Sequence, residues 1–264
     1  MEIKPAFLVI ADISGYTRFL QLHTMSLLHA EQIITELLET VIDAAEHPLQ
    51  ISKLEGDAVF LYALAHDDKQ SAAHDIWQQA HAFFTAFQEK AQMLIACNEC
   101  PCDACHNIGQ LKLKVVMHYG EVAIKRIRQF EELAGRDVIL VHRLMKNSIT
   151  VREYILMTTD FQQFLQPNVT ADWEERSEHV DDLGPVPILV YYPQHHMSTP
   201  QPNPDGHRLA QVNRLTKYSV ARLRGKEEER PFNNLPTDTS LSWRDYIQSA
   251  IKTIWWNLRQ KRPS

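Results

Sequence analysis

Apolar residues along the first 192 positions follow the two repeats that distinguish strands from helices. Residues 6–11 form an unbroken apolar run, which predicts a strand buried on both faces. Short β-prone runs predict six further strands, at 50–54, 58–62, 111–118, 122–124, 154–157 and 188–192. Apolar residues at helical spacing predict helices at 30–45, 71–95 and 135–146, and Thr17 is a candidate N-cap of an earlier helix.

The order of these elements predicts the fold class. Some strands follow one another through short turns, at Glu55-Gly56-Asp57 and Tyr119-Gly120-Glu121, whereas others are separated by helices. Such an order mixes antiparallel hairpins with crossover connections. We therefore expect an α+β, ferredoxin-like fold with one mixed, mainly antiparallel sheet and helices on one face.

The segment after Pro193 has a different composition. Residues 193–236 are rich in proline, asparagine and charge, and residues 198–206 read as a linker. Apolar side chains return at helical spacing over residues 241–260, which predicts an amphipathic helix. We expect two parts: a folded domain over residues 1–195 with a cysteine-rich insertion at 97–106, then a basic linker and helical tail over 196–264.

Charge is divided unevenly between these parts. The 264 residues are 44% hydrophobic and 23% charged, as in ordinary globular proteins, and the formal net charge is -6. Residues 1–199 carry 15 Lys and Arg against 27 Asp and Glu, whereas residues 200–264 carry 12 against 6. The acidic whole offers no electrostatic case for nucleic-acid binding. The basic helix either docks on an acidic body, which the opposite charges favour, or lies on an anionic membrane surface.

Sequence features also bear on the cellular compartment. No apolar run approaches the roughly 18 residues of a membrane span, and the first residues lack a secretory pattern. All four cysteines lie within nine residues, whereas disulfides that stabilise a fold join distant segments. We expect a cytoplasmic protein.

The cysteine cluster has two interpretations. Four thiolates suit a tetrahedral Zn²⁺ site, and Cys97, Cys100, Cys102 and Cys105 form two Cys-x2-Cys pairs. The single residue between the pairs, Pro101, makes closure around one ion tight. The alternative is a surface loop of reduced, redox-labile thiols. We expect a structural metal, at a distance from the catalytic residues.

Two carboxylates indicate a second site. Asp12 ends the first strand and Asp57 lies in a hairpin turn, and one sheet can bring such positions together. Facing carboxylates repel unless a cation lies between them, and hard divalent cations prefer oxygen ligands. The residues after Ile13, namely Ser14, Gly15, Tyr16 and Thr17, present backbone N–H groups at a helix start, which suits phosphate oxygens. Metal and phosphate together suggest nucleotide chemistry.

Four segments in this order resemble the catalytic domain of class III nucleotidyl cyclases, the adenylate and guanylate cyclases. Phe7 to Thr17 resembles the first metal motif and Lys53 to Phe60 the second. Val115 to Val122 resembles a later hairpin, and Gly135 to Leu144 the helix that carries the transition-state arginine. The resemblance covers roughly residues 5–192. It is greatest to a soluble bacterial branch in which several members also carry a cysteine cluster here.

The resemblance implies a mechanism and an assembly. Asp12, Asp57 and the backbone carbonyl of Ile13 would hold two Mg²⁺ or Mn²⁺ ions. A nucleoside triphosphate would cyclise by attack of its 3′-hydroxyl on the α-phosphate, and Arg143 would stabilise the charge that develops there. In this family the site forms in a head-to-tail dimer, with metals from one chain and the arginine from the other. We therefore expect a homodimer.

Other family positions are occupied by unusual residues. Ile51 falls at the position expected for a base-reading lysine, and Glu132 at that of its acidic partner. Ile139 replaces a ribose-orienting asparagine, and the last hairpin offers no phosphate-binding lysine. His118 and His142 flank these motifs, and histidines in such half-buried elements are more often packing residues than ligand contacts.

These departures leave three hypotheses. The first is a metal-dependent nucleotidyl cyclase with atypical base recognition. The second is a catalytically silent cyclase-fold module that binds a nucleotide or a protein partner and regulates it. A third makes the cysteine cluster a metal or redox sensor that controls the dimer.

Overall fold

The structure, a computed structural model, describes residues 2–22, 27–96, 103–169 and 173–193. It contains eight strands: β1 (Glu2–Ser14), β2 (Gln50–Glu55), β3 (Ala58–Leu64), β4 (Lys112–Ile127), β5 (Phe130–Ala134), β6 (Tyr154–Thr158), β7 (Glu174–Val180) and β8 (Gly184–Tyr191). The α-helices are α1 (Tyr16–Leu22), α2 (Leu27–Asp43), α3 (Lys69–Ala96), α4 (Asp103–His106), α5 (Arg136–Leu144) and α6 (Thr159–Gln162). Short 3₁₀ turns lie at Ile108–Gln110 and Pro167–Val169.

The strands form one mixed sheet in the order β2-β3-β1-β4-β6-β8-β7, with β5 paired to β4 outside this path. Only β4 and β6 run parallel, and every other pair is antiparallel. The α+β class and the mixed, mainly antiparallel sheet are therefore confirmed. Both hairpin strands around Glu55-Gly56-Asp57 also appear as expected, as β2 and β3.

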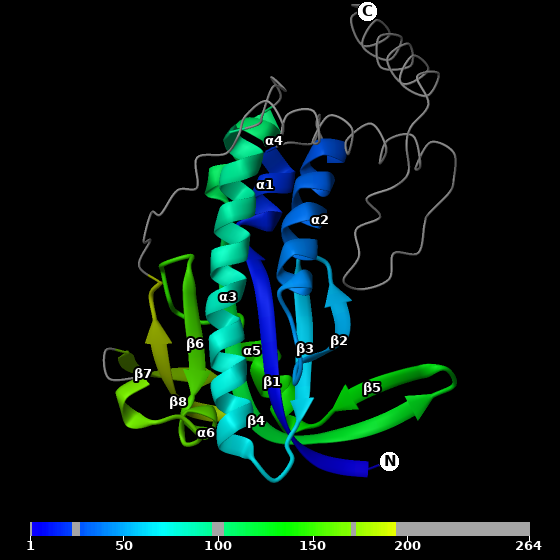
Figure 1. Cartoon of the computed structure of the whole chain (residues 1–264), viewed down its shortest axis with the longest axis vertical. Helices are drawn as coiled ribbons and strands as arrows, with labels where there is room; N and C mark the ends of the chain where they lie inside the picture. The colour runs from blue at the N-terminus through cyan, green and yellow to red at the C-terminus, as the bar shows by residue number, and fades with distance from the viewer. Residues whose placement is uncertain (1, 23–26, 97–102, 170–172, 194–264) are drawn as a thin grey trace, which may run out of the picture. The chain divides into compact units, whose positions relative to one another are not determined.

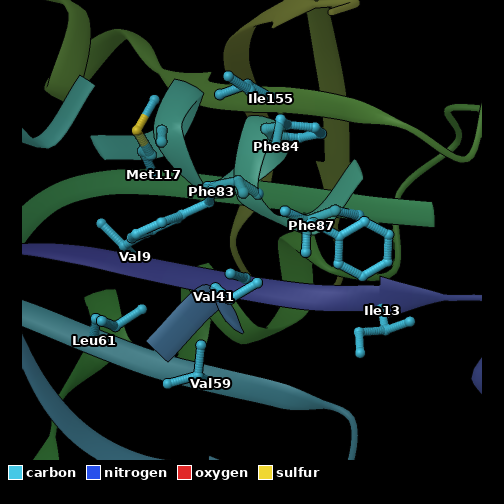
Figure 2. Close-up of a cluster of buried hydrophobic side chains, with 14 of the residues drawn as sticks. Val9, Ile13, Val41, Val59, Leu61, Phe83, Phe84, Phe87, Met117 and Ile155 are labelled. Carbon is cyan, nitrogen blue, oxygen red and sulfur yellow. The ribbon is translucent and has the colours of Figure 1, made fainter. Parts of the chain in front are cut away.

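Strand β1 is the centre of two cores. Phe7, Val9 and Ile13 point to one face of the sheet, whereas Leu8 and Ile10 point to the other, and all five side chains are buried. This alternation follows from the two-residue period of a strand, and explains why the apolar run is unbroken. Figure 2 shows the larger core, in which residues of β1 and β3 meet Val41 of α2 and the phenylalanines of α3.

The two long helices, α2 and α3, cover one face of the sheet (Figure 1). The short helix α5 is an exception to the expected single helical layer. Its residues Val138, Val141 and Leu144 pack with Leu8 and Ile10 on the opposite face. Helix α5 thus lies on the face that carries Phe60 of the β2–β3 hairpin. None of the helices in the described ranges is both long and apolar enough to cross a membrane.

Three local predictions were wrong. No turn forms at Tyr119-Gly120-Glu121, because β4 runs straight through it and turns only near Arg128, which has a positive φ of 57°. Strands β5 and β7 were not predicted: residues 122–124 belong to β4 and not to a separate strand, and the sequence of β7 is largely charged. Thr17 is not an N-cap, because α1 already begins at Tyr16.

Gly120 allows helix α5 to lie close to β4. A Cβ at this position would come within 2.2 Å of Asp137 Oδ2, and the same carboxylate oxygen accepts a 2.6 Å hydrogen bond from the Glu121 N–H. Behind this contact the buried His118 hydrogen-bonds Thr158 Oγ1 through Nδ1 at 2.8 Å. Its Nε2 lies 3.6 Å from Asp137 Oδ1, so His118 is part of the packing under α5.

We expect Gly120→Ala to lower the free energy of unfolding by about 1–3 kcal/mol, because Asp137 and the start of α5 must move to admit the methyl group. Urea unfolding followed by circular dichroism measures the change. Gly109→Ala is the control, since its nearest foreign atom would be 3.7 Å from the new Cβ. Equal stability of the two variants would contradict the close approach.

Candidate active site

Asp12 and Asp57 are brought to one edge of the sheet by the β1–β3 pairing. Asp12 lies opposite Ala58, the residue that follows Asp57, and the Ile13 N–H donates a 3.1 Å hydrogen bond to the Asp57 carbonyl. The β2–β3 turn is thus fixed against the end of β1. The Ile13 side chain is fully buried in the core, so only its backbone can face a ligand.

The two carboxylates influence each other electrostatically. Burial, and next the charge of Asp12, raise the pKa of Asp57 to about 6, while Lys114 opposes this shift. An acidic pair of this kind favours a cation, and oxygen ligands suit Mg²⁺ or Mn²⁺. No three His, Cys, Asp or Glu side chains of the described residues gather into a complete metal cage. The pair offers two oxygen ligands of the kind that a hard divalent cation prefers.

Lys114 is a third member of this site that sequence reasoning missed. Residues 114 and 12 are direct partners across β4 and β1, and Lys114 Nζ lies 2.9 Å from Asp12 Oδ2. Only 19% of the Lys114 side chain and 16% of the Asp12 side chain are exposed. The ammonium also donates a 3.3 Å hydrogen bond to the carbonyl of Met145, just beyond α5.

The raised pKa of Asp57 predicts a pH-dependent stability. A carboxyl group whose pKa is higher in the folded than in the unfolded state stabilises the fold below the unfolded value, and this contribution is lost as the pH rises through about 6. In EDTA, Asp57→Asn should therefore raise the Tm by a few degrees at pH 7.5 and have little effect near pH 4.5. Asp67→Asn, at an exposed carboxylate, is the control. An unchanged or lower Tm of Asp57→Asn at pH 7.5 would contradict the prediction.

The turn that we expect to bind phosphate, Ser14 to Thr17, combines a buried residue at its start with an exposed residue at its end. Ser14 is buried at the end of β1, and Gly15 has a positive φ of 95°, which a side chain would strain. The Tyr16 hydroxyl donates a 3.3 Å hydrogen bond to Glu31 of α2, whereas Thr17 is exposed.

Arg152 adds a positive charge beside this turn. One of its guanidinium nitrogens would lie 3.9 Å from a Cβ placed at Gly15. Its neighbour Glu153 is buried and accepts a 3.0 Å hydrogen bond from Gln88 of α3, which fixes the chain at this point. Sequence reasoning missed Arg152, because residues 15 and 152 are distant in the chain and no local pattern links them.

Arg143 lies on the outer side of α5. It follows Ile139 by one helical turn, so the two side chains share a face, and Ile139 is 51% exposed. The Arg143 guanidinium donates to the Asp181 carbonyl and lies 3.1 Å from Asp182 Oδ2, both in the β7–β8 turn. Within its own chain the arginine therefore points to this acidic turn.

His142 connects α5 to strand β2. Its Nδ1 contacts the Val138 carbonyl at 2.7 Å, and its Nε2 lies 3.0 Å from Glu55 Oε2. Burial alone would raise the pKa of Glu55, but hydrogen bonds from Lys53 and His142 lower it below its usual value. The histidine thus fixes α5 against the β2–β3 hairpin, one residue away from Arg143.

Lys53 lies beside Glu55, the β2 residue that contacts α5, whereas Ile51 does not. Ile51 packs against the core under α2 and α3, and the β2–β3 register shifts between residues 51 and 53. Lys53 Nζ pairs with Glu55 Oε1 at 3.0 Å and keeps 42% of its side chain exposed. The irregular strand accounts for the difference, since counting from Gly56 cannot reveal a bulge.

Glu132 does not join the acidic pair within one chain. It lies on β5 opposite Lys125 of β4, at the far end of the sheet from Asp12. Lys125 lies eleven positions beyond Lys114 along β4, a path of roughly 36 Å.

Only one residue of the cysteine cluster can be described. Cys105 is half-buried on α4, and its Sγ lies 3.8 Å from His29 Nδ1 of α2. Cys97, Cys100 and Cys102, together with the C-terminal tail, lie outside the described residues. The zinc site therefore stays a prediction.

Two comparisons of sequence place the chain among known proteins. Residues 34–154 match a family model described as a protein of unknown function, DUF2652. The chain is also similar to the uncharacterized protein Rv2561/Rv2562 of Mycobacterium tuberculosis (strain ATCC 25618 / H37Rv). The two are 36% identical over 172 residues, which cover 61% of this chain and 79% of the relative.

Comparison with solved structures shows the fold. The adenylyl cyclase CyaB from P. aeruginosa matches with a TM-score of 0.56 and 17% identity, over 74% of this chain and 97% of that one. The guanylyl cyclase Cya2 matches with a TM-score of 0.57 and 17% identity, over 75% of this chain and 96% of that one. The sheet and its helices therefore have the class III cyclase fold.

Proposed function

The chain belongs to the family of the M. tuberculosis protein Rv2561/Rv2562 and has a cyclase fold, and on this premise we propose that it is a nucleotidyl cyclase. It converts a nucleoside triphosphate to a 3′,5′-cyclic nucleotide and pyrophosphate. The observation that carries the proposal is the close pair of Asp12 and Asp57 at the edge of the cyclase-fold sheet. Each carboxylate has a matching position in the metal motifs of the resembled family.

Asp12, Asp57 and the Ile13 carbonyl are the residues that would hold Mg²⁺ or Mn²⁺. The bound cations would supply charge neutralisation at the phosphates and a lower pKa for the attacking 3′-hydroxyl. The 3′-oxygen forms a bond to the α-phosphorus, the bond to pyrophosphate breaks, and the hydroxyl proton is released. The turn from Ser14 to Thr17, with Arg152 beside it, binds and orients the phosphates.

A second copy of the chain completes the site in this proposal. Arg143 stabilises the charge on the α-phosphate, but in its own chain it points to Asp181 and Asp182 of the β7–β8 turn. A head-to-tail homodimer lets Arg143 of one protomer serve the acidic pair of its partner. Lys53 pairs with Glu55 of β2, which in turn contacts His142 of α5. Lys53 supplies the hydrogen-bond donor to the base, which Ile51 cannot do.

Two further segments, the cysteine-rich insertion and the basic tail, accompany the cyclase domain in this proposal. We propose that the domain spans residues 1–195 and that the protein, with its cysteine-rich insertion at 97–106, belongs to a cysteine-bearing branch of cyclase-like proteins. The basic tail over 196–264 docks on an acidic body, its own or that of a dimer partner.

The test is turnover with each of ATP, GTP, CTP and UTP in Mn²⁺, with products identified by mass spectrometry. We expect one or more cyclic nucleotides from the wild-type protein, no product in EDTA, and none from Asp12→Asn purified in the same way. The base of the product would show which nucleotide Lys53 and its neighbours accept.

No product from any triphosphate would contradict the cyclase proposal. Isothermal titration with a non-hydrolysable triphosphate then separates two cases. Binding that Asp57→Asn weakens would indicate the silent nucleotide-binding module, whereas absence of binding would remove the nucleotide from the function altogether.

A further inference from the structure

Lys114 already provides a positive charge at the acidic pair. Its ammonium contacts Asp12 Oδ2 at 2.9 Å and the Met145 carbonyl at 3.3 Å, and it also lowers the pKa of Asp57 through its charge. Its backbone is fixed directly opposite Asp12 by the β1–β4 register. The low exposure of both side chains keeps water from screening the ion pair. The ion pair is therefore a built feature of the sheet edge, unlike a mobile surface contact.

We propose that Lys114 is a built-in counter-ion that weakens divalent-cation binding by the nucleotide-free protein, so that cation and triphosphate bind together. The identity of the cation rests on the proposed function. Two ionised carboxylates and one ammonium leave one net negative charge, where the carboxylates alone would have two. A divalent cation must compete with Lys114 for Asp12, and charges this close repel strongly in a poorly solvated site.

A triphosphate changes this balance. Its negative charge offsets the repulsion between Lys114 and the arriving cation, and its oxygens supply ligands that two carboxylates cannot. Lys114 has three N–H donors, of which Asp12 and the Met145 carbonyl use two. When Asp12 turns to the cation, the Met145 contact still holds the ammonium at the end of α5, the helix that carries Arg143.

The experiment measures Mn²⁺ binding without nucleotide, by electron paramagnetic resonance of free Mn²⁺. We expect Lys114→Met to bind Mn²⁺ at least about tenfold more tightly than the wild-type protein. Lys112→Met is the matched control: it removes the same charge two residues earlier on β4, where Lys112 lies opposite Ser14 and pairs with Glu153 at 3.7 Å. Lys112→Met should leave Mn²⁺ affinity unchanged.

A second readout guards against a folding defect. The Tm of Lys114→Met should rise more on addition of Mn²⁺ than that of the wild-type protein, because tighter binding gives more stabilisation. Lys114→Gln serves in its place if the Met variant does not fold. Adding Asp57→Asn to Lys114→Met should remove the gain, which locates the ion at the acidic pair.

The outcomes distinguish this inference from the proposed function. Cyclase turnover together with equal or weaker Mn²⁺ binding by Lys114→Met would overturn the role of Lys114 and leave the cyclase proposal standing. A tenfold gain without turnover would support Lys114 and contradict the cyclase. If the wild-type protein gave no turnover and Lys114→Met gave no gain in Mn²⁺ affinity, both the cyclase proposal and the role of Lys114 would be contradicted.

Discussion

Two variants that each lack activity, Asp12→Asn and Arg143→Ala, are expected to restore turnover when they are mixed. The first lacks a metal-binding carboxylate, and we expect a loss of about a thousandfold or more. The second lacks the guanidinium that stabilises the α-phosphate, with a loss of about 10²–10³-fold. In a mixed dimer one of the two sites has an intact Asp12 from one protomer and an intact Arg143 from the other.

Equal mixing with free subunit exchange makes about half of the dimers mixed, so activity should return to about a quarter of the wild-type value. The measurement is cyclic-nucleotide formation against mixing ratio, which should peak at equal amounts. Arg136→Ala is the control, since Arg136 is an exposed arginine at the other end of the same helix. If the mixture gave only the sum of its components, each site would lie within one chain, contrary to the proposal.

Arg143→Lys should recover little of the lost activity. A lysine keeps the charge, but it cannot make the two parallel hydrogen bonds of a guanidinium to phosphate oxygens. In the structure Arg143 spans two acceptors at once, the Asp181 carbonyl and the Asp182 carboxylate. Substantial turnover by Arg143→Lys would show that only its charge matters.

The parts of the fold that could be predicted depend on local patterns. The apolar run of residues 6–11 identified the central strand, and the Gly56-Asp57 turn identified the β2–β3 hairpin. These two elements together position Asp12 and Asp57, because a strand end and a hairpin turn in adjacent strands meet at one edge. For this reason the acidic pair was accessible from sequence.

The rest depends on contacts between distant segments. Lys114 reaches Asp12 through the β1–β4 pairing, which nothing in either strand specifies. Strand β2 is irregular, so that Lys53 pairs with Glu55 near α5 while Ile51 packs against the core, and a residue count assumes a regular strand. The turn expected at Gly120 fails because this glycine makes room for Asp137 of α5. In each case the tertiary partner, absent from the local pattern, determines the role of the residue.

A buried ion pair between α2 and α3 shows the same limit and carries the largest expected effect on stability. Lys90 Nζ of α3 lies 2.6 Å from Glu36 Oε2 of α2, with 8% and 7% of the two side chains exposed. Gln32 donates a 3.3 Å hydrogen bond to the other carboxylate oxygen. Because the charges lie away from water, each depends on its partner. Lys90→Met should therefore lower the free energy of unfolding by about 3–5 kcal/mol.

Urea unfolding of Lys90→Met, Glu36→Leu and the double variant measures the coupling between the two side chains. The double variant should be close to the wild-type protein or more stable, because two apolar side chains remove the need to desolvate either charge. Lys146→Met, at an exposed lysine, is the control for charge loss alone. If the double variant were as unstable as the sum of the single ones, the two side chains would act independently, and packing of their stems would account for the stability. If it recovers, α2 and α3 are held over the sheet by apolar packing, and the ion pair sets which residues of the two helices meet.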